Sequence, residues 1–279
     1  EQVIVFPFSG APVPEGFVDY EQLLAGADPD GFVYAPHAET DPVSMCYTSG
    51  TTGRAKGVVY SHRSTVLHTL VASLGDYVGL RGSDVVLPVT PMFHANSWGV
   101  PYAAVMTGAK LVFPGPHLHP EDLLDLMQLE PPTLSLGVPT IWMSLIQLFE
   151  RGLAEQPGRW AMPKGMRSLV GGAPVPESLI RAFDRHGVWL LQGWGMTETS
   201  GIGTFTRAND IRVGTIGPAY EGVQVKIDPS TGELLTRGPH LFKGYLNLPD
   251  KTAEVFDAEG WFHTGDVGTM DAAGYLRIT

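Results

Sequence analysis

The sequence predicts an α/β fold with mostly parallel sheets flanked by helices, followed by a small strand-rich, β-barrel-like subdomain. Short apolar runs alternate with helical patterns up to about residue 192, and this alternation is typical of a parallel sheet. After about Ser200 the helical patterns end, and short strands follow one another across turns. Of the 279 residues, 43% are hydrophobic, which is enough for a sizeable core.

The first part of the chain is expected to supply the parallel strands and their helices. The apolar run at residues 43–47 predicts a strand, and residues 57–60 resume an extended pattern. Ser61 is a typical N-cap for a helix towards Leu74, with Gly75 as its stop. Further strands are expected at residues 85–89, 110–113, 133–136, 167–170 and 188–192. Further helices are expected at residues 97–107, 120–129, 139–150 and 176–186.

The second part is expected to consist mainly of strands. Residues 223–227, 233–237 and 275–278 have strand patterns, and turn residues such as Asp228-Pro229-Ser230-Thr231-Gly232 separate them. No strongly amphipathic helix is expected between them. We therefore predict a division into residues 1–205, the α/β part, and residues 206–279, the β-rich subdomain.

The balance of charges excludes some classes of partner. Eighteen basic residues stand against 29 acidic ones, and the net charge of −11 argues against nucleic acid and an anionic membrane. The single cysteine, Cys46, excludes an intrachain disulfide. Residues 85–109 carry no Asp, Glu, Lys or Arg, but Pro88, Pro91 and Pro101 interrupt them, so we expect no transmembrane segment. These features favour a reduced, cytoplasmic enzyme.

A segment rich in Gly and Thr follows the first predicted strand. Thr48-Ser49-Gly50-Thr51-Thr52-Gly53 offers backbone N–H groups and hydroxyls to a phosphate, and Lys56 adds a positive charge. The Gly-Lys-Ser/Thr of a Walker A loop is absent, and Ser49 lacks the Gly-x-Ser-x-Gly frame of a nucleophile elbow. The density of donors favours a phosphate-binding loop over an ordinary flexible turn.

Two later turns carry groups that suit a nucleotide. In Gly193-Trp194-Gly195-Met196-Thr197-Glu198 the indole can stack on a base, the Thr can reach a phosphate, and the Glu can hold Mg²⁺. Thr264-Gly265-Asp266 places a carboxylate that can accept hydrogen bonds from the hydroxyls of a ribose. Taken singly, each turn is equally compatible with a structural role.

Taken together and in this order, the three segments resemble the adenylate-forming superfamily of acyl-CoA synthetases, luciferases and peptide-synthetase adenylation domains. The resemblance runs from about residue 40 to residue 279, and the segments between the motifs match as well, at residues 91–94, 137–140, 171–174 and 237–239. Residues 59–64 and 91–98 look most like bacterial medium- and long-chain fatty-acyl-CoA ligases.

This resemblance implies a two-step reaction that uses ATP, Mg²⁺ and coenzyme A. A fatty acid and ATP would give an acyl-adenylate and pyrophosphate, and the CoA thiol would then displace AMP to give acyl-CoA. An aryl acid or another carboxylate is the alternative substrate within the same superfamily. A P-loop phosphohydrolase is disfavoured because the Walker A sequence is missing. The expected partners are small molecules, and a homodimer is left open.

The resemblance also implies roles for single residues. Lys56 and the loop from Thr48 to Gly53 would hold the β- and γ-phosphates, and Asp266 would hold the ribose. Thr197 would contact the α-phosphate, and Glu198 would bind Mg²⁺. The catalytic set implied is Lys56, His94, Thr197 and Glu198. The adenine slot would be formed by Gly172, Ala173, Trp194 and Gly195. Gly193 and Met196 are further expected cofactor contacts. Substrate contacts would come from His94, Trp98, Gly99 and Val138.

Trp98 is expected to gate the acyl site, a role implied by the similarity to the long-chain ligases. It follows His94 by four residues, so both would lie on one face of the helix at residues 97–107 if that helix starts early enough. The five residues after Trp98 are uncharged, as a wall facing an alkyl chain should be. The alternative is that Trp98 is a core residue.

The sequence departs from the superfamily pattern at a few points. Ala55 stands where Pro usually precedes the loop lysine, and Trp194 stands where Tyr is common. The resemblance further implies an Asp-Arg hinge and a mobile C-terminal domain with a catalytic lysine, which this sequence does not contain. We therefore expect a fragment of the large domain, and one alternative is that residues 1–279 bind ATP or acyl-AMP without turnover.

Overall fold

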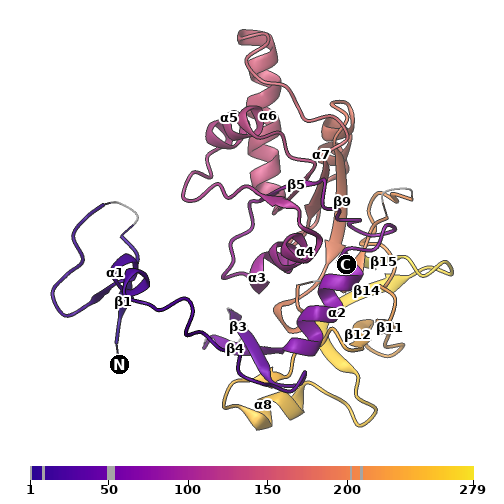
Figure 1. Cartoon of the computed structure of the whole chain (residues 1–279). Coiled ribbons are helices and arrows are strands. Elements are labelled where there is room, and N and C mark those ends of the chain that lie inside the picture. Colours follow the sequence, from indigo (N-terminus) through magenta and orange to yellow (C-terminus); the bar gives the residue numbers. More distant parts are fainter. Residues whose placement is uncertain (1, 8–9, 49–53, 202, 208–209) are drawn as a thin grey trace. The chain divides into compact units, whose positions relative to one another are not determined.

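A computed structural model describes the chain except for residues 1, 8–9, 49–53, 202 and 208–209 (Figure 1). The chain divides into two compact units, Glu1–Ala38 and Glu39–Thr279. The first unit contains the parallel strands β1 (Ile4–Val5) and β2 (Val18–Asp19) and the helix α1 (Tyr20–Ala25). The second unit contains all the other elements, and the candidate site lies within it.

A six-stranded sheet forms the centre of the second unit, with the strand order β10-β9-β8-β7-β5-β6. Its strands are β5 (Val85–Pro88), β6 (Lys110–Leu111), β7 (Leu134–Gly137), β8 (Arg167–Val170), β9 (Trp189–Trp194) and β10 (Thr204–Phe205). β5 to β9 run parallel to their neighbours, and only β10 is antiparallel to β9. The predicted alternation of strands and helices, and the parallel sheet that it implied, are confirmed.

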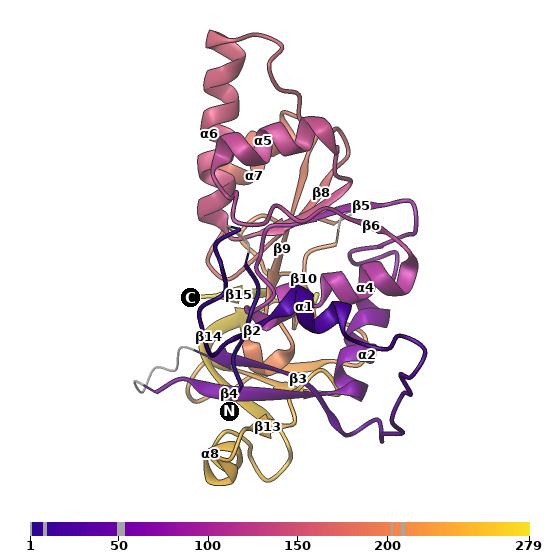
Figure 2. The same ribbon diagram turned by 60° about the vertical axis from the view of Figure 1, so that its left-hand side comes forward.

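Helices cover both faces of this sheet. On one face lie α5 (Pro120–Leu129), α6 (Pro139–Glu155) and α7 (Glu177–Asp184), which Figures 1 and 2 show gathered together. On the other face lie α2 (His62–Ala72) and α4 (Val100–Thr107). Neighbouring residues of a strand point to opposite faces, so Leu87 belongs to the first core and Val86 to the second. Across the described residues, we find no helix with the length and apolar character needed to span a bilayer.

Two antiparallel sheets complete the second unit. β3 (Pro42–Thr48), β4 (Lys56–Ser61) and β13 (Gly244–Tyr245) form a sheet with the order β13-β4-β3. The other sheet has the order β11-β12-β14-β15 and consists of β11 (Gln224–Ile227), β12 (Glu233–Arg237), β14 (Phe262–Met270) and β15 (Leu276–Ile278). A short helix, α8 (Pro249–Glu254), buries none of its residues. The strand-rich character of this part is confirmed, and its boundary near residue 205 stays a prediction.

The helix expected at residues 97–107 differs from the prediction, because α4 begins only at Val100. The residues before it form a left-handed turn, α3 (Ala95–Trp98), in which φ lies between 44° and 53°. A right-handed helix therefore does not connect His94 to Trp98, and the prediction that they share one helical face is wrong.

Hydrogen bonds hold this left-handed turn in place. The Ser97 hydroxyl donates to the carbonyl oxygen of Thr90 at 2.6 Å, and the Asn96 side-chain amide donates to the Ser44 hydroxyl at 3.0 Å. Left-handed backbone costs roughly 1–2 kcal/mol per residue outside glycine. Such a turn persists only where its surroundings fix it, as these bonds to β3 and to the end of β5 do.

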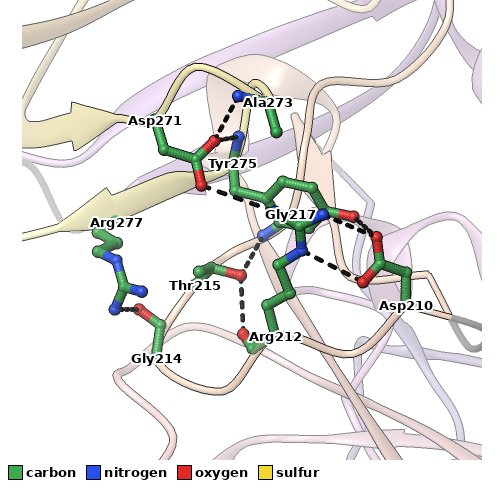
Figure 3. Close-up of polar contacts among 9 residues, drawn as sticks. All are labelled: Asp210, Arg212, Gly214, Thr215, Gly217, Asp271, Ala273, Tyr275 and Arg277. Carbon is green, nitrogen blue, oxygen red and sulfur yellow. Dashed lines mark hydrogen bonds and ion pairs between the residues drawn. The ribbon is translucent and has the colours of Figure 1, made fainter.

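The hairpin of β14 and β15 is anchored to the segment that precedes β11 (Figure 3). The Tyr275 hydroxyl donates to the carboxylate of Asp210, and the Arg212 guanidinium lies 3.6 Å from the centroid of the Tyr275 ring. Arg277 donates to the carbonyl oxygen of Gly214 at 3.1 Å. These contacts fix the end of the sheet whose strand β14 reaches the candidate site.

Candidate active site

A cavity of about 920 Å³ lies where the parallel strands end and the two antiparallel sheets meet. All three segments that the sequence singles out contribute to its wall. The predicted site residues that line it are Thr48, Lys56, His94, Trp98, Val138, Gly172, Gly193, Trp194, Gly195, Met196, Thr197, Glu198 and Asp266. Gly99 and Ala173 are not among the lining residues, and Ser49, Gly50, Thr51, Thr52 and Gly53 lie outside the described residues.

One end of the cavity offers a cation and a free hydroxyl. Thr48 and Lys56 are paired in register across β3 and β4, so both side chains stand at the start of the predicted phosphate loop. The Thr48 hydroxyl is buried and has no hydrogen-bond partner among the described residues. The Lys56 ammonium lies 4.3 Å from the centroid of the Tyr245 ring, and no carboxylate in the described part of the chain pairs with it. This end of the cavity is therefore suited to an anion.

Glu198 brings a buried carboxylate to the same end. It lies in a short 3₁₀ turn, η1 (Thr197–Thr199), and only 6% of it is exposed. The Tyr245 hydroxyl donates to its Oε1 at 2.8 Å. Burial, together with the charge of Glu198, raises the pKa of the Tyr245 hydroxyl, so this group stays protonated and remains a donor. The Tyr60 hydroxyl fixes the same turn by donating to the carbonyl oxygen of Thr197 at 2.7 Å.

Asp266 and Trp194 meet on the opposite wall, although they come from different sheets. The indole N–H of Trp194, at the end of β9, donates to Oδ2 of Asp266, in β14, at 2.7 Å. This bond orients the carboxylate and leaves Oδ1 for a ligand. Trp194 is only 9% exposed and also packs in a small core. Only a small part of its surface is therefore available at the cavity for the predicted stacking on a base.

Thr264, Gly265 and Asp266, which the sequence predicts as a turn, lie inside β14 and are held from the neighbouring strand β12. The Glu233 carboxylate accepts a hydrogen bond from the backbone N–H of Gly265 at 2.9 Å, and its other oxygen lies 2.9 Å from Nδ1 of His263. The Thr264 hydroxyl donates to the carbonyl oxygen of Leu234 at 2.6 Å. The position of Asp266 therefore depends on β12 as well as on its own strand.

Apolar side chains form another part of the cavity wall, and Trp98 is one of them. Trp98 is 7% exposed and belongs to the core beneath the sheet, yet part of its indole lines the cavity. Gly201 packs closely against the left-handed turn, because an added Cβ would lie 3.2 Å from the Trp98 Cα and 3.3 Å from the Ala95 Cβ. Gly99, in contrast, lies against His68, so its predicted contact with substrate stays a prediction.

Sequence reasoning missed three residues that shape this cavity, namely Tyr245, Glu233 and His263. Tyr245 lies in a two-residue strand between turns, where no periodic pattern marks it. The sequence pattern indicates Glu233 only as the first residue of a predicted strand. Its position directly after the Gly232 turn gives no local sign that it faces Gly265, because that contact forms between strands about thirty residues apart in sequence.

A metal ion at this site would have few protein ligands. Across the described residues, no cluster of three or more His, Cys, Asp or Glu side chains could hold a metal. Glu198 offers one oxygen, since Tyr245 engages the other. That donor set fits Mg²⁺, which is commonly bound through one or two carboxylates together with substrate phosphates and water.

Comparison with known proteins gives a consistent result. Residues 11–246 match a family model described as AMP-binding enzyme. The medium-chain-fatty-acid–CoA ligase of Ectopseudomonas oleovorans is 39% identical over 94% of this chain and 50% of its own length. The 3-methylmercaptopropionyl-CoA ligase of Ruegeria pomeroyi is 40% identical over 95% of this chain and 51% of its own length.

A solved structure shows the same fold. The crystal structure of ATP-bound MatB from Rhodopseudomonas palustris matches with a TM-score of 0.80 and 32% identity, covering 95% of this chain and 53% of that one. The chain described here thus spans about half the length of the curated relatives it matches.

Proposed function

Because this chain belongs to the AMP-binding enzyme family, we propose that it forms the nucleotide- and acid-binding part of an AMP-forming fatty-acid–CoA ligase. One observation carries this proposal: Lys56, Glu198 and Asp266 line a single cavity, whose wall also contains apolar side chains such as Trp98 and Val138. The charged groups suit the phosphates and ribose of ATP, and the apolar groups suit an alkyl chain.

The first step would join a carboxylate oxygen of the acid to the α-phosphorus of ATP. The bond from that phosphorus to the oxygen shared with the β-phosphate would break, and pyrophosphate would leave with its electron pair. Both reactants are anions, so positive charge and hydrogen-bond donors must be concentrated where they meet. Lys56 and the free Thr48 hydroxyl would hold the β- and γ-phosphates, and Thr197 would contact the α-phosphate.

Glu198 would hold Mg²⁺, whose charge would offset that of the phosphates. The bond from Tyr245 to Oε1 would orient the Glu198 carboxylate and leave Oε2 towards the cavity. Trp194 would contact the adenine beside Gly172 and Gly195, and Asp266 would accept hydrogen bonds from the ribose. In the second step the CoA sulfur would attack the acyl carbonyl carbon, and AMP would leave.

His94 and Trp98 would define the acid end of the site. His94 lines the cavity as N-cap of the left-handed turn, and its side chain makes no capping hydrogen bond to the described residues of that turn, so its imidazole would be available to a carboxylate. Trp98 and Val138 would contact the chain of the acid, with Trp98 as the gate. The alternative, in which Trp98 is a core residue, draws support from its low exposure.

Two alternatives remain, each with an observation in its favour. One is a ligase for another carboxylate, such as a short thioether acid, because one relative of 40% identity is named for 3-methylmercaptopropionyl-CoA. The other is a module that binds ATP or acyl-AMP without turnover, because the chain spans half the length of its relatives. A cytoplasmic location and a homodimer stay predictions.

The test separates binding from turnover. ATP binding by the purified protein is measured by calorimetry, and turnover is measured as acid-dependent pyrophosphate release and CoA-dependent AMP release. The acids are octanoate, dodecanoate, hexadecanoate, benzoate and 3-(methylthio)propanoate. Turnover that is fastest with the straight-chain acids is expected. ATP binding without pyrophosphate release would favour the binding module, and preference for benzoate or the thioether acid would favour the other ligases.

A further inference from the structure

A second, much smaller cavity lies on the far side of Gly99 from the candidate site. It measures about 30 Å³ and is lined by α2, by residues 220–223 and by Pro239 and His240. Its wall contains the exposed Glu221 and three buried polar side chains, of which 9% of His68 and 6% each of Tyr220 and His240 are exposed. The rest of the wall is mainly apolar, with Leu67, Val71 and Val223.

Each of the three polar side chains has a buried atom without a partner among the described residues. These atoms are His68 Nε2, His240 Nδ1 and the Tyr220 hydroxyl oxygen. Buried polar groups are rarely left unpaired, so three around one cavity require an explanation. Glu221 also lines the cavity, and its backbone N–H donates to the Tyr77 hydroxyl at 3.1 Å.

Thr236 contacts the Nε2 side of the His240 imidazole. Its hydroxyl lies 3.1 Å from the carbonyl oxygen of Gln224, to which it can donate, and 3.2 Å from His240 Nε2. When the hydroxyl donates to Gln224, it accepts from Nε2, and the proton of the neutral imidazole sits on Nε2. In that tautomer His240 Nδ1 is a buried acceptor without a partner among the described residues.

We propose that this cavity is a hydration site, occupied by one water molecule that donates to His240 Nδ1 and bonds to His68 and Tyr220. The volume is of the size that one water takes up, and buried waters commonly make about three hydrogen bonds. A water can donate and accept at once, so it satisfies the bare Nδ1 together with the Tyr220 hydroxyl and whichever form His68 Nε2 takes. No protein group described at this cavity can do so.

The hydration site joins segments that also carry the candidate active site. His68 stands against Gly99, the residue between Trp98 and α4, where an added Cβ would lie 2.5 Å from the imidazole. The carbonyl oxygen of His240 accepts a hydrogen bond from the Ser200 hydroxyl at 2.9 Å, directly after the η1 turn that holds Glu198. The water therefore stabilises two segments beside the larger cavity, the one that contains Trp98 and Gly99 and the one that contains η1 and Ser200.

Tyr220→Phe distinguishes a hydrated cavity from a dry one by the sign of its effect. If water is present, the variant removes a hydrogen bond, and the melting temperature falls by about 2–4 °C. If the cavity is dry, the variant removes an unpaired hydroxyl, and the melting temperature stays the same or rises. Tyr77→Phe is the control, because the Tyr77 hydroxyl has a known partner and its loss should lower the melting temperature in either case.

A crystal structure of the purified protein provides the independent measurement. Density for a single oxygen within hydrogen-bond distance of His240 Nδ1 supports the hydration site. An empty cavity overturns it, as does a melting temperature that rises with added Zn²⁺ and falls with EDTA, which would indicate a metal between the two imidazoles.

Discussion

Glu198 is a largely buried carboxylate, since only 6% of the residue is exposed. Its stabilising contacts come from a distant part of the chain, because Tyr245 donates to it and also lies beneath the Lys56 ammonium. The three side chains therefore form one unit, with the aromatic ring between the cation and the carboxylate. A substitution at one of these residues should therefore alter the contacts of the other two.

Glu198→Gln separates the charge of this residue from its packing. The amide oxygen can still accept from Tyr245, so the melting temperature should change little. Loss of the charge should lower ATP-dependent pyrophosphate release about ten- to a hundred-fold, on the order of 1.5–3 kcal/mol for a charged contact. The exposed Glu259→Gln serves as the matched control. Equal rates in the two variants would contradict the role of Glu198.

Two glycines at the ends of α4 allow backbone strain to be separated from steric conflict. Gly99 and Gly108 cap the helix with φ of 69° and 76°. An added Cβ at Gly108 would meet nothing within 4 Å, whereas at Gly99 it would lie 2.5 Å from buried His68. Gly108→Ala should cost about 1–2 kcal/mol for the left-handed backbone, and Gly99→Ala a further 1–3 kcal/mol or so for overpacking. Denaturant unfolding of both variants measures the difference, and equal losses would show that His68 moves aside freely.

At the scale of elements, α2 is a helix whose start can be read from the sequence. Ser61 is its N-cap, as predicted: the Ser61 hydroxyl accepts from the Ser64 backbone N–H at 3.1 Å, and the Ser64 hydroxyl accepts from that of Ser61 at 3.2 Å. Ser61→Ala should therefore cost about 1 kcal/mol of unfolding free energy. Ser144→Ala, at an exposed position inside α6, should be neutral or slightly stabilising. Urea unfolding checks both, and a neutral Ser61→Ala would mean that the cap does not stabilise α2.

Other elements show where sequence patterns stop being informative. The helix at Pro120–Leu129 has the predicted bounds, because its apolar residues repeat with the period of a helix. The strand at Arg167–Val170 also has the predicted bounds, although its apolar residues form a short run without alternation. The left-handed turn at Ala95–Trp98 could not be predicted, since none of its residues is glycine and its conformation depends on bonds to Thr90 and Ser44. Local preference was overridden there by tertiary contacts.

At the scale of the whole molecule, two buried histidines should make stability depend on pH. Burial lowers the pKa of His68 and of His240 to about 4, from an ordinary value of 6.5, and the charge of His68 adds to the lowering at His240. Between pH 6.5 and 4 the unfolded chain binds protons that the folded chain excludes. The free energy of unfolding should therefore fall as the pH is lowered through this window, by about 3 kcal/mol at most for each histidine, and level off below about pH 4.

Urea unfolding at a series of pH values from 7 to 4 measures this dependence. The variant His240→Gln removes one of the two titrating groups, so its stability should vary less steeply with pH than that of the parent protein. An unchanged slope would show that His240 is not excluded from protonation in the folded state.

The candidate site was predictable from sequence to the extent that its groups lie in ordered motifs. Thr48, Lys56, Glu198 and Asp266 line one cavity, as the motifs suggested. Tyr245 and Glu233 could not be found this way, because each acts on a residue that is remote in sequence and belongs to another element. Only the pairing of strands brings such partners together, and that pairing is a property of the whole chain.

The pairing of β4 with β13 also determines when parts of the fold can form during synthesis of the chain. Val58 pairs with Tyr245, so the partner of an early strand leaves the ribosome about 190 residues later. At a synthesis rate of about 5–20 residues per second, one edge of β4, the strand that contains Lys56, stays unpaired for on the order of ten seconds or longer. The anion-binding end of the cavity is thus completed late in synthesis. Nascent chains released before Tyr245 should lack nucleotide affinity and should depend on chaperones to avoid association through that open edge.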